Sequence, residues 1–436
     1  MSSSQPSSLL ERIQASSEKD RACIAALLTG WFGALLDPLF VEKHRVSKTD
    51  FTRVRQLTFL RVVLFCLISF ARSSVREALE LIFSKGQSPV KVAPVTPSAL
   101  CQSLQKIGHS AFIDANTILV SRFRKTDLSR TWHGFRVTAI DGSVLNLPRF
   151  KALMEAFVPG VDPSLPGATA ARLSLLLDVT NSLVLDARVG SCQTGEREYA
   201  FKHLEVLGEG DIVLGDRGYP SLEFFAKIRE RGAHFAIRMP GHWKAVKQFR
   251  RSGEKEAIVT LPSRKDPSFT MTVRLLKIEH EGKSMVVATS LLDATLFPLE
   301  LFSELYHMRW WNEEWYKELK GVLALESVSG RSEEAFRREL HARILTQNLI
   351  SLFSLPSLRA LQEEAKTHPP KGRPRDRTAR TKPNRAATAD YLRTGLALLF
   401  DSLRSLSALP SWILRKTLPV RSAVRPGRAF PRIRAA

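Results

Sequence analysis

The order of strand-like and helix-like segments between Phe135 and Arg238 constrains the fold more than any other feature of this sequence. Three segments rich in apolar and β-branched residues come first, and a helix, a strand, a helix and a strand follow. Thr180, Asn181 and Ser182 separate the second segment from the third and predict a hairpin. The segments are residues 135–140, 171–179, 183–189, 195–207, 211–216, 221–232 and 234–238. This order predicts an α/β fold with a ribonuclease-H-like mixed sheet.

Residues 1–125 are expected to form a helical N-terminal DNA-binding region. Thr96-Pro97 supplies a helix cap followed by proline at the first helical position. The helix after it carries Gln102, Gln105 and Lys106 on its polar side. Such a helix enters a DNA groove in some compact helical units and merely packs in others. The helical patterns lie at 22–36, 59–70, 74–83 and 98–107.

The rest of the chain divides by composition. Alternating β-branched segments after the last strand predict a β-rich insertion within the catalytic domain, and an amphipathic helix is expected near its end. A proline-containing stretch with eight Lys or Arg then predicts an extended linker that attracts phosphate, followed by a helical and basic tail. The predicted parts are the catalytic domain 130–360, its insertion 239–295, the helix 332–353, the linker 364–388, the tail 389–436 and its helix 391–406.

The charge of the chain favours a polyanionic partner. With 65 Lys+Arg against 43 Asp+Glu, the net charge is +22 and the pI is near 10.2, which favours nucleic acid, although a basic membrane-surface protein carries the same charge. Four well-separated cysteines without a CxxC pair predict reduced thiols. The start lacks a signal-peptide pattern and the longest apolar run is too short for a bilayer, so we expect an intracellular protein.

Two aspartates follow apolar strands. Asp141 ends the first predicted strand in AIDGSVLNLP, where Asp-Gly is also typical of a hairpin turn. Asp216 ends a buried strand in VLGDRGYPS, where an ordinary polar strand end or a helix cap is the alternative. In a ribonuclease-H-like sheet the first and fourth strands are neighbours. Both carboxylates are then expected at the same end of the sheet.

The stretch 305–325 reads as one amphipathic helix. At about 100° per residue, four polar side chains fall within roughly 60° of one another, and they are Tyr306, Arg309, Glu313 and Lys320. An apolar, aromatic-rich face lies opposite and contains Leu305, Met308, Trp311, Trp315, Leu319 and Val322. Taken alone, such a polar stripe is more often a solvated surface than a site. Beside the two aspartates, it offers a third carboxylate.

Three converging carboxylates in a basic protein have a specific use. Mg²⁺ prefers oxygen ligands, and two such ions activate the attacking oxygen and stabilise the leaving oxygen of a phosphoryl displacement. Without metal, the acids would repel a DNA phosphate. Surrounding Lys and Arg side chains hold the DNA backbone.

With these residues the chain resembles bacterial insertion-sequence transposases of the DDE class, in the branch with the signature Tyr-x2-Arg-x3-Glu-x6-Lys. All four signature residues stand at full spacing from Tyr306 to Lys320, and AIDGS and LGDRGY are similar to the branch's two Asp motifs. The resemblance extends over residues 50–353. It implies a cut-and-paste transposase of the bacterial cytoplasm and nucleoid that acts on double-stranded DNA as a homodimer.

The resemblance also implies roles for individual residues. Two Mg²⁺ ions, with Mn²⁺ as a substitute, would be held by Asp141, Asp216 and Glu313. Phosphates of the transposon end would be contacted by Tyr306, Arg309 and Lys320, with Arg217 and Tyr219 beside the second aspartate. Members of the branch nick the end with water, form a hairpin with the freed 3′ hydroxyl, and join the reopened end to target DNA.

One feature departs from the branch. Some relatives stack a flipped base on a tryptophan of the β insertion, but the comparable strand here has Met285, and the insertion's tryptophan is Trp243. Either Trp243 takes this role or the base is handled otherwise. Trp310 is a further candidate, with simple packing as its alternative.

Three other functions are alternatives. One is a transposase-derived DNA-binding protein that no longer cuts, and another is a related metal nuclease without strand transfer. A basic RNA-binding or membrane-surface protein is the third, and it leaves the three acids unexplained.

Overall fold

The computed structural model describes the chain over eleven stretches, and all structural statements concern these. They are residues 9–53, 55–69, 78–79, 95–160, 169–263, 266, 268–280, 283–310, 320–367, 381–399 and 406–423.

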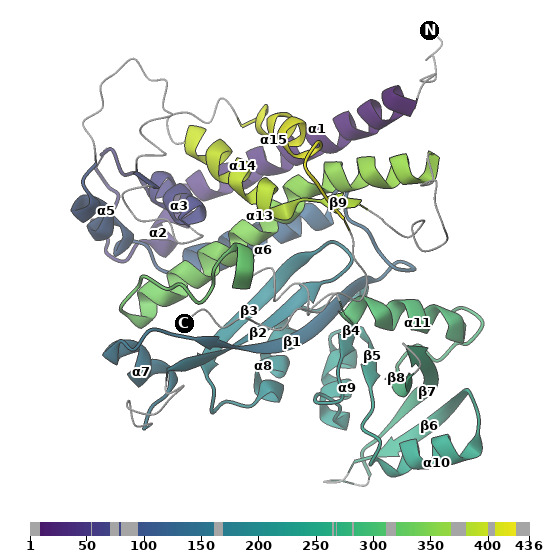
Figure 1. Ribbon diagram of the computed structural model, residues 1–436. Helices are drawn as coiled ribbons and strands as arrows, with labels where there is room; N and C mark the ends of the chain where they lie inside the picture. Colours follow the sequence, from purple (N-terminus) through teal and green to yellow (C-terminus); the bar gives the residue numbers. More distant parts are fainter. Residues whose placement is uncertain are drawn as a thin grey trace.

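One eight-stranded mixed sheet forms the centre of the described fold (Figure 1). Its order is β3-β2-β1-β4-β5-β8-β7-β6. β2 is antiparallel to β1 and β3, whereas β4 is parallel to β1 and β5. This confirms the predicted α/β fold with a ribonuclease-H-like sheet. The strands are β1 (Arg136–Asn146), β2 (Ala170–Asp178), β3 (Leu183–Ser191), β4 (Asp211–Gly215), β5 (His234–Arg238), β6 (Glu256–Pro262), β7 (Thr270–His280) and β8 (Lys283–Thr289).

Helices cover both faces of the sheet (Figure 1). On one side, α6 (Ser110–Arg124) and α13 (Glu333–Thr367) pack against β3. On the other, α8 (Glu196–His203) packs against β2 and α9 (Leu222–Glu230) against β5. A strand covered on both faces needs apolar residues throughout, which explains why every residue of β4 is buried.

Two apolar cores follow from this arrangement, because successive strand residues point to opposite faces. Along β1, Ala139 belongs to the core on the α13 side and Ile140 to the core under α8 and α9. Along β4, Leu214 belongs to the α13 side and Val213 to the other. The side of the sheet that each residue faces is therefore known along both strands.

Capping side chains mark the starts of three N-terminal helices. Side chains of Asp37, Thr58 and Thr96 accept a backbone N–H at the start of α2, α3 and α5. The predicted helices at 22–36, 59–70 and 98–107 are thus confirmed apart from their ends, while 74–83 falls mostly outside the described residues. These helices are α1 (Leu9–Leu36), α2 (Pro38–His44), α3 (Phe59–Ile68) and α5 (Pro97–Leu104). In the described part, no single helix is long and apolar enough to cross a membrane; α1 and α2 pass that test only as a pair bent by 60°.

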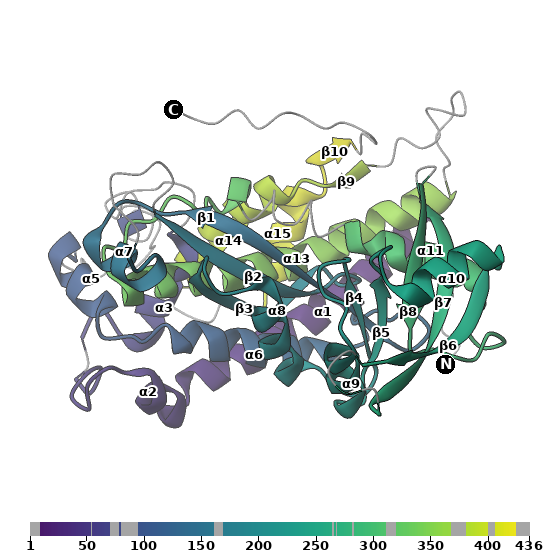
Figure 2. The same ribbon diagram turned by 90° about the horizontal axis from the view of Figure 1, so that it is seen from below.

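The first strand is longer than the sequence predicts. β1 continues through Asp141 and Gly142, which pair with Leu175 and Ser174 of β2. The expectation that Asp141 ends the strand is wrong, and so is the hairpin-turn alternative, because pairing with β2 extends the strand to Asn146. Figure 2 shows β1 and β2 running on together toward α7 (Lys151–Phe157), past the end of β4.

The strands of the predicted β insertion extend the main sheet. β8 pairs with β5, and β7 and β6 follow outward. The helix α10 (Lys244–Ser252), which the sequence analysis did not predict, lies beside β6 at this end of the sheet (Figure 2).

The helix expected at 305–325 differs at both described ends. α11 (Leu299–His307) starts after Pro298, whose extended backbone caps it, and passes into a 3₁₀ turn, Met308–Trp310. Residues 311–319 lie outside the described chain, and Ala324 has φ 48°, which interrupts any helix. Tyr306 and Arg309, the first two members of the expected polar face, are buried.

The C-terminal part is more helical than expected. The helix predicted at 332–353 is the longer α13, which continues past Pro356. The helix predicted at 391–406 starts earlier, as α14 (Arg385–Leu398), and α15 (Leu409–Thr417) follows. The sequence analysis did not predict the two antiparallel strands of this part, β9 (Thr381–Pro383) and β10 (Arg421–Ala423), which pair with each other.

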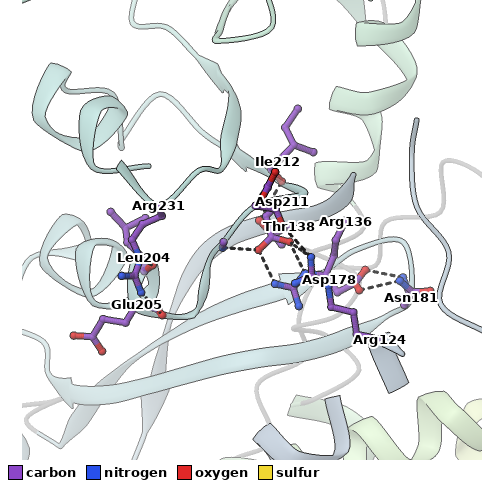
Figure 3. Close-up of polar contacts among 12 residues, drawn as sticks. Arg124, Arg136, Thr138, Asp178, Asn181, Leu204, Glu205, Asp211, Ile212 and Arg231 are labelled. Atoms are coloured by element: carbon purple, nitrogen blue, oxygen red, sulfur yellow. Dashed lines mark hydrogen bonds and ion pairs between the residues drawn. The ribbon is translucent and has the colours of Figure 1, made fainter. Parts of the chain in front are cut away.

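Buried charges tie the start of β1 to the start of β4 (Figure 3). The guanidinium of Arg136 donates from Nε and Nη2 to the two carboxylate oxygens of Asp211, at 2.8 and 2.7 Å. Arg124 stands 3.4 Å from the same carboxylate, and the Thr138 hydroxyl donates to the Ile212 carbonyl. Since Arg136 and Asp211 are direct partners in the parallel pairing, this contact fixes the register of the two strands.

Candidate active site

The register of β1 and β4 brings two predicted acids to one place. Ala139 pairs with Leu214, and continuing that register by two residues sets Asp141 opposite Asp216. Neighbouring strands are about 4.8 Å apart. β4 ends at Gly215 while β1 runs on, so both acids stand at the sheet edge where β4 stops.

Both acids also point to the same side of the sheet. Asp141 is two residues beyond Ala139, and Asp216 is two beyond Leu214; both of these apolar residues face the α13 side. Alternation along a strand gives the aspartates that same face. The same core contains Tyr306 and Leu323, which flank the segment with the third predicted acid. The carboxylates therefore lie on the side of the sheet that also holds Tyr306 and Leu323.

Charged and polar side chains surround the two acids. Nη1 of Arg238, at the end of β5, is 3.5 Å from Oδ1 of Asp216. Burial raises the pKa of Tyr219 well above its usual value, and the carboxylates of Asp141, Glu196 and Asp216 raise this pKa further. All three acids are thus close enough to Tyr219 for their charge to act on its hydroxyl.

Tyr306 connects α11 to the end of β4. Its side chain is 1% exposed, and its hydroxyl donates a hydrogen bond to the Gly215 carbonyl at 3.1 Å. The guanidinium of Arg309 lies 5.6 Å from the centre of its ring, and burial raises the pKa of the phenol. The residue before Asp216 is therefore held by a signature side chain.

Lys320 connects the far end of the signature to β1. Its ammonium donates to the Val144 carbonyl at 2.7 Å and lies 3.4 Å from the carboxylate of Glu326. The same carboxylate accepts hydrogen bonds from the backbone N–H and the side-chain amide of Asn146. These contacts attach Lys320 and Glu326 to β1, three to five residues beyond Asp141.

Comparison with known proteins identifies the domain that carries this geometry. Residues 132–349, half of the chain, match the family described as the transposase DDE domain. The chain belongs to this family. The DDE transposases are phosphoryl-transfer enzymes that use a divalent metal, so the predicted transposase is confirmed at this level.

Two individual proteins are similar to this chain to different degrees. The chain is 24% identical over 343 residues to the transposase InsG of insertion sequence element IS4 from Escherichia coli, over 73% of this chain and 75% of that protein. A piggyBac transposase synaptic complex with hairpin DNA matches with 9% identity and a TM-score of 0.41, over 88% of this chain and 84% of the other.

The remaining predicted site residues of this transposase differ in exposure, and some lie outside the described residues. Arg217 is exposed directly after Asp216, whereas Tyr219 is buried. Glu313 lies outside the described residues, as does the side chain of Trp310. Met285 is 5% exposed inside the core, and Trp243 is half-buried at the start of α10.

The described carboxylates supply part of a metal-binding site. Carboxylate oxygens of Asp141 and Asp216 are the hard ligands that a divalent cation of the Mg²⁺ type prefers. Within the described ranges, no three His, Cys, Asp or Glu side chains come together as metal ligands. Glu313 is the residue that the sequence offers for the third position.

Sequence reasoning missed several residues around the transposase site. One is Arg238, 3.5 Å from Asp216, and another is Glu326, beside Lys320. Arg197 donates from Nε to the Gly218 carbonyl at 2.7 Å, which holds the loop after Asp216. Arg238 had a readable signal, because it ends the strand next to β4. Glu326 and Arg197 had none, since Asn146 and Gly218, which they contact, are 180 and 21 residues away.

Proposed function

We propose that this DDE transposase cleaves DNA at transposon inverted-repeat ends and transfers the cut strand into target DNA. The observation that carries the proposal is the β1–β4 register, which brings Asp141 and Asp216 to one edge and one face of the sheet. The net charge of +22 supports double-stranded DNA as the substrate. Water and then a DNA 3′ hydroxyl would be the attacking groups.

Asp141, Asp216 and Glu313 are the residues that would hold two Mg²⁺ ions, with Mn²⁺ as a substitute. Bound metal supplies activation of the attacking oxygen and stabilisation of the leaving oxygen. Arg238 contributes a fixed positive charge 3.5 Å from Asp216, which partly offsets the repulsion between the two aspartates. It also offers a donor to a DNA phosphate that approaches this acid.

Four side chains are proposed to hold the DNA end, and they are Tyr306, Arg309, Lys320 and Arg217. Arg217 is exposed and reaches a phosphate without rearrangement. Lys320 has three N–H donors, and its two described partners, Val144 and Glu326, leave one for DNA. The hydroxyl proton of Tyr306 is bonded to Gly215, so a phosphate contact requires it to leave that carbonyl.

The finer features of the reaction are part of the same proposal. The spacing of Tyr306, Arg309, Glu313 and Lys320 supports the branch with that signature and hence a hairpin route. For base stacking we favour Trp243, because Met285 is inside the core. The active form is proposed to be a homodimer holding two ends, in the cytoplasm and nucleoid of a bacterium.

The test uses a labelled duplex that ends in the element's inverted repeat. Asp141→Ala, Asp216→Ala and Glu313→Ala are each expected to abolish cleavage with Mg²⁺ or Mn²⁺ and to leave end binding in a gel shift largely intact. Cleavage at the wild-type rate by any of these variants would remove that residue from the site.

Wild-type protein distinguishes the alternatives in the same assay. Binding without metal-dependent cleavage supports a transposase-derived DNA-binding protein, and cleavage without joining to a supercoiled target supports a nuclease. Joined products that carry the labelled end, formed only by the wild-type protein, support the transposase.

A further inference from the structure

The loop after β4 carries Asp216 beyond the last residue that the sheet pairs. β4 pairs with β5 as far as Gly215, where the strand ends. Asp141, in contrast, lies inside β1 and pairs with Leu175 of β2. Strand pairing therefore fixes the position of Asp141, whereas the position of Asp216 depends on contacts of the loop.

Residues 216–219 form a turn that is attached to α8. The Tyr219 N–H donates to the Asp216 carbonyl at 3.1 Å and closes the turn. Nε of Arg197, in the first turn of α8, donates to the Gly218 carbonyl at 2.7 Å. The first bond is local, but the second connects the turn to a different element. A shift of the turn away from α8 breaks this second bond.

The residue before Arg197 connects the same helix turn to β1. A Cβ added to Gly142 would lie 3.5 Å from Cδ and Oε1 of Glu196, which is ordinary contact distance. The Glu196 carboxylate therefore lies over the residue that follows Asp141. Nη1 of Arg172, on β2, donates to this carboxylate at 2.7 Å and holds it there.

The helix α8 reaches both acids from behind. It packs on the face of the sheet opposite to the one that Asp141 and Asp216 share, and alternation along β1 directs Gly142 toward α8. Glu196 and Arg197 thus contact the two acid-bearing segments through Gly142 and through the Gly218 carbonyl. Two consecutive residues of one helix turn link the neighbours of both aspartates.

This link acts on the distance between the two carboxylates. Neighbouring strands are about 4.8 Å apart, so the two acids repel each other when no metal is bound. The repulsion displaces Asp216 more easily than Asp141, because Asp216 lies beyond the strand pairing. Two metal ions about 3.5–4 Å apart require their ligands to be held within about 0.5 Å. A bond that restrains the turn of Asp216 therefore favours metal binding.

Arg197 contributes little to the core of the domain. Its side chain is exposed, whereas Tyr199 and Ala200 anchor α8 in the core on this face of the sheet. Loss of the guanidinium leaves that anchor in place. A variant of Arg197 is therefore expected to fold, and its effect on the site can be measured.

We propose that Arg197 is a positioning residue, which holds the turn of Asp216 at the distance from Asp141 that the two divalent cations require. It acts through the Gly218 carbonyl, and Glu196 supplies the contact of the same helix turn with β1. This inference rests on the proposed function and deepens its metal site.

Direct measurement of Mn²⁺ binding tests the proposal without cleavage. The full-length protein is bound to an inverted-repeat duplex that is already cut at its end, with no target DNA, and electron paramagnetic resonance measures free Mn²⁺. Binding that Asp141→Ala abolishes is assigned to the site. Arg197→Met removes the donor and keeps a long side chain, and it is expected to weaken Mn²⁺ binding about 10–100-fold, as loss of an outer-shell partner does. Arg197→Lys keeps a donor and is expected to bind Mn²⁺ more tightly than Arg197→Met.

Arg231→Met is the matched control. Arg231 is also exposed and donates to the carbonyls of Leu204 and Glu205, at 3.0 and 2.6 Å, at the far end of α8 (Figure 3). The control removes bonds of the same kind on the same face of the sheet. It is expected to leave Mn²⁺ binding unchanged.

Three results would overturn the inference. They are wild-type Mn²⁺ affinity in Arg197→Met, an equal loss of affinity in Arg231→Met, and weaker duplex binding by Arg197→Met in the absence of metal. The last result would make Arg197 a DNA contact instead of a positioning residue. Melting temperatures close to that of the wild-type protein show that the variants fold.

Failure of this inference is distinguishable from failure of the proposed function. Wild-type protein that binds no more Mn²⁺ than Asp141→Ala refutes the proposed metal site. Wild-type binding with unaltered affinity in Arg197→Met refutes only the positioning role.

Discussion

Breaking the buried ion pair between Arg136 and Asp211 is expected to destabilise the catalytic domain strongly. Asp211 is fully buried, and the side chain of Arg136 is 8% exposed. Arg136→Met removes both N–H donors at 2.8 and 2.7 Å and leaves the carboxylate with Arg124 at 3.4 Å and the Gly208 N–H. An uncompensated buried charge costs about 3–5 kcal/mol. Because Arg124 remains, we expect the lower end of that range.

A double substitution that removes both charges tests this reasoning. Arg136→Met/Asp211→Leu removes both charges, and replacing a buried pair with apolar side chains is often neutral or stabilising. Here the Gly208 N–H loses its acceptor, at a cost of about 1 kcal/mol. The double variant is therefore expected to be more stable than Arg136→Met alone, although it carries one more substitution.

Thermal unfolding measures this cycle. A loss of about 3 kcal/mol lowers the midpoint by roughly 6–12 °C for a domain of this size, and the double variant is expected to recover more than half of that. A single variant within about 1 °C of wild type would refute the argument that the pair is buried and paired. Purely additive losses in the double variant would refute the argument that an isolated charge causes the damage.

Three further changes test other parts of the structure. Burial raises the pKa of Asp178 to about 6, so its contribution to stability is full below about pH 4 and is lost as pH rises through 6. The melting temperature of Asp178→Asn is therefore expected to rise relative to that of the wild-type protein as the pH increases from 4 to 7. A constant difference between the two melting temperatures over this range would contradict the prediction. Tyr306→Phe removes the bond to Gly215, at a cost of about 1 kcal/mol, and is expected to slow single-turnover cleavage several-fold. Glu326→Gln keeps an acceptor but removes the charge beside Lys320, and it is expected to slow cleavage without lowering end binding; an unchanged cleavage rate in either variant would remove it from the positioning contacts.

Local patterns determined the kind of each element. Short segments rich in apolar and β-branched residues predict the strands that became β2 to β5, and Thr96-Pro97 predicts the start of α5. Net charge and the acids Asp141 and Asp216 predicted a nucleic-acid enzyme. These properties depend on neighbouring residues in the chain, so they can be read without the fold.

Long-range pairing determined where elements end. β1 passes through Asp-Gly because β2 pairs with it as far as Asn146. α13 continues past Pro356 because it packs against α1, α3, α14 and α15, which compensates for the missing backbone N–H. β8 joins β5 because the edge of β5 offers unpaired backbone groups.

The sequence by itself determined the succession of strands and helices from β1 to β5 along the chain, the basic charge and the residue types at the proposed site. Only the tertiary structure decided that Tyr306 bonds to Gly215 and Lys320 to Val144, across 91 and 176 residues. It also decided that Asp141 lies inside a strand and still faces the same side as Asp216. Such contacts arise from the register and burial of segments far apart in the chain, and no local pattern encodes either.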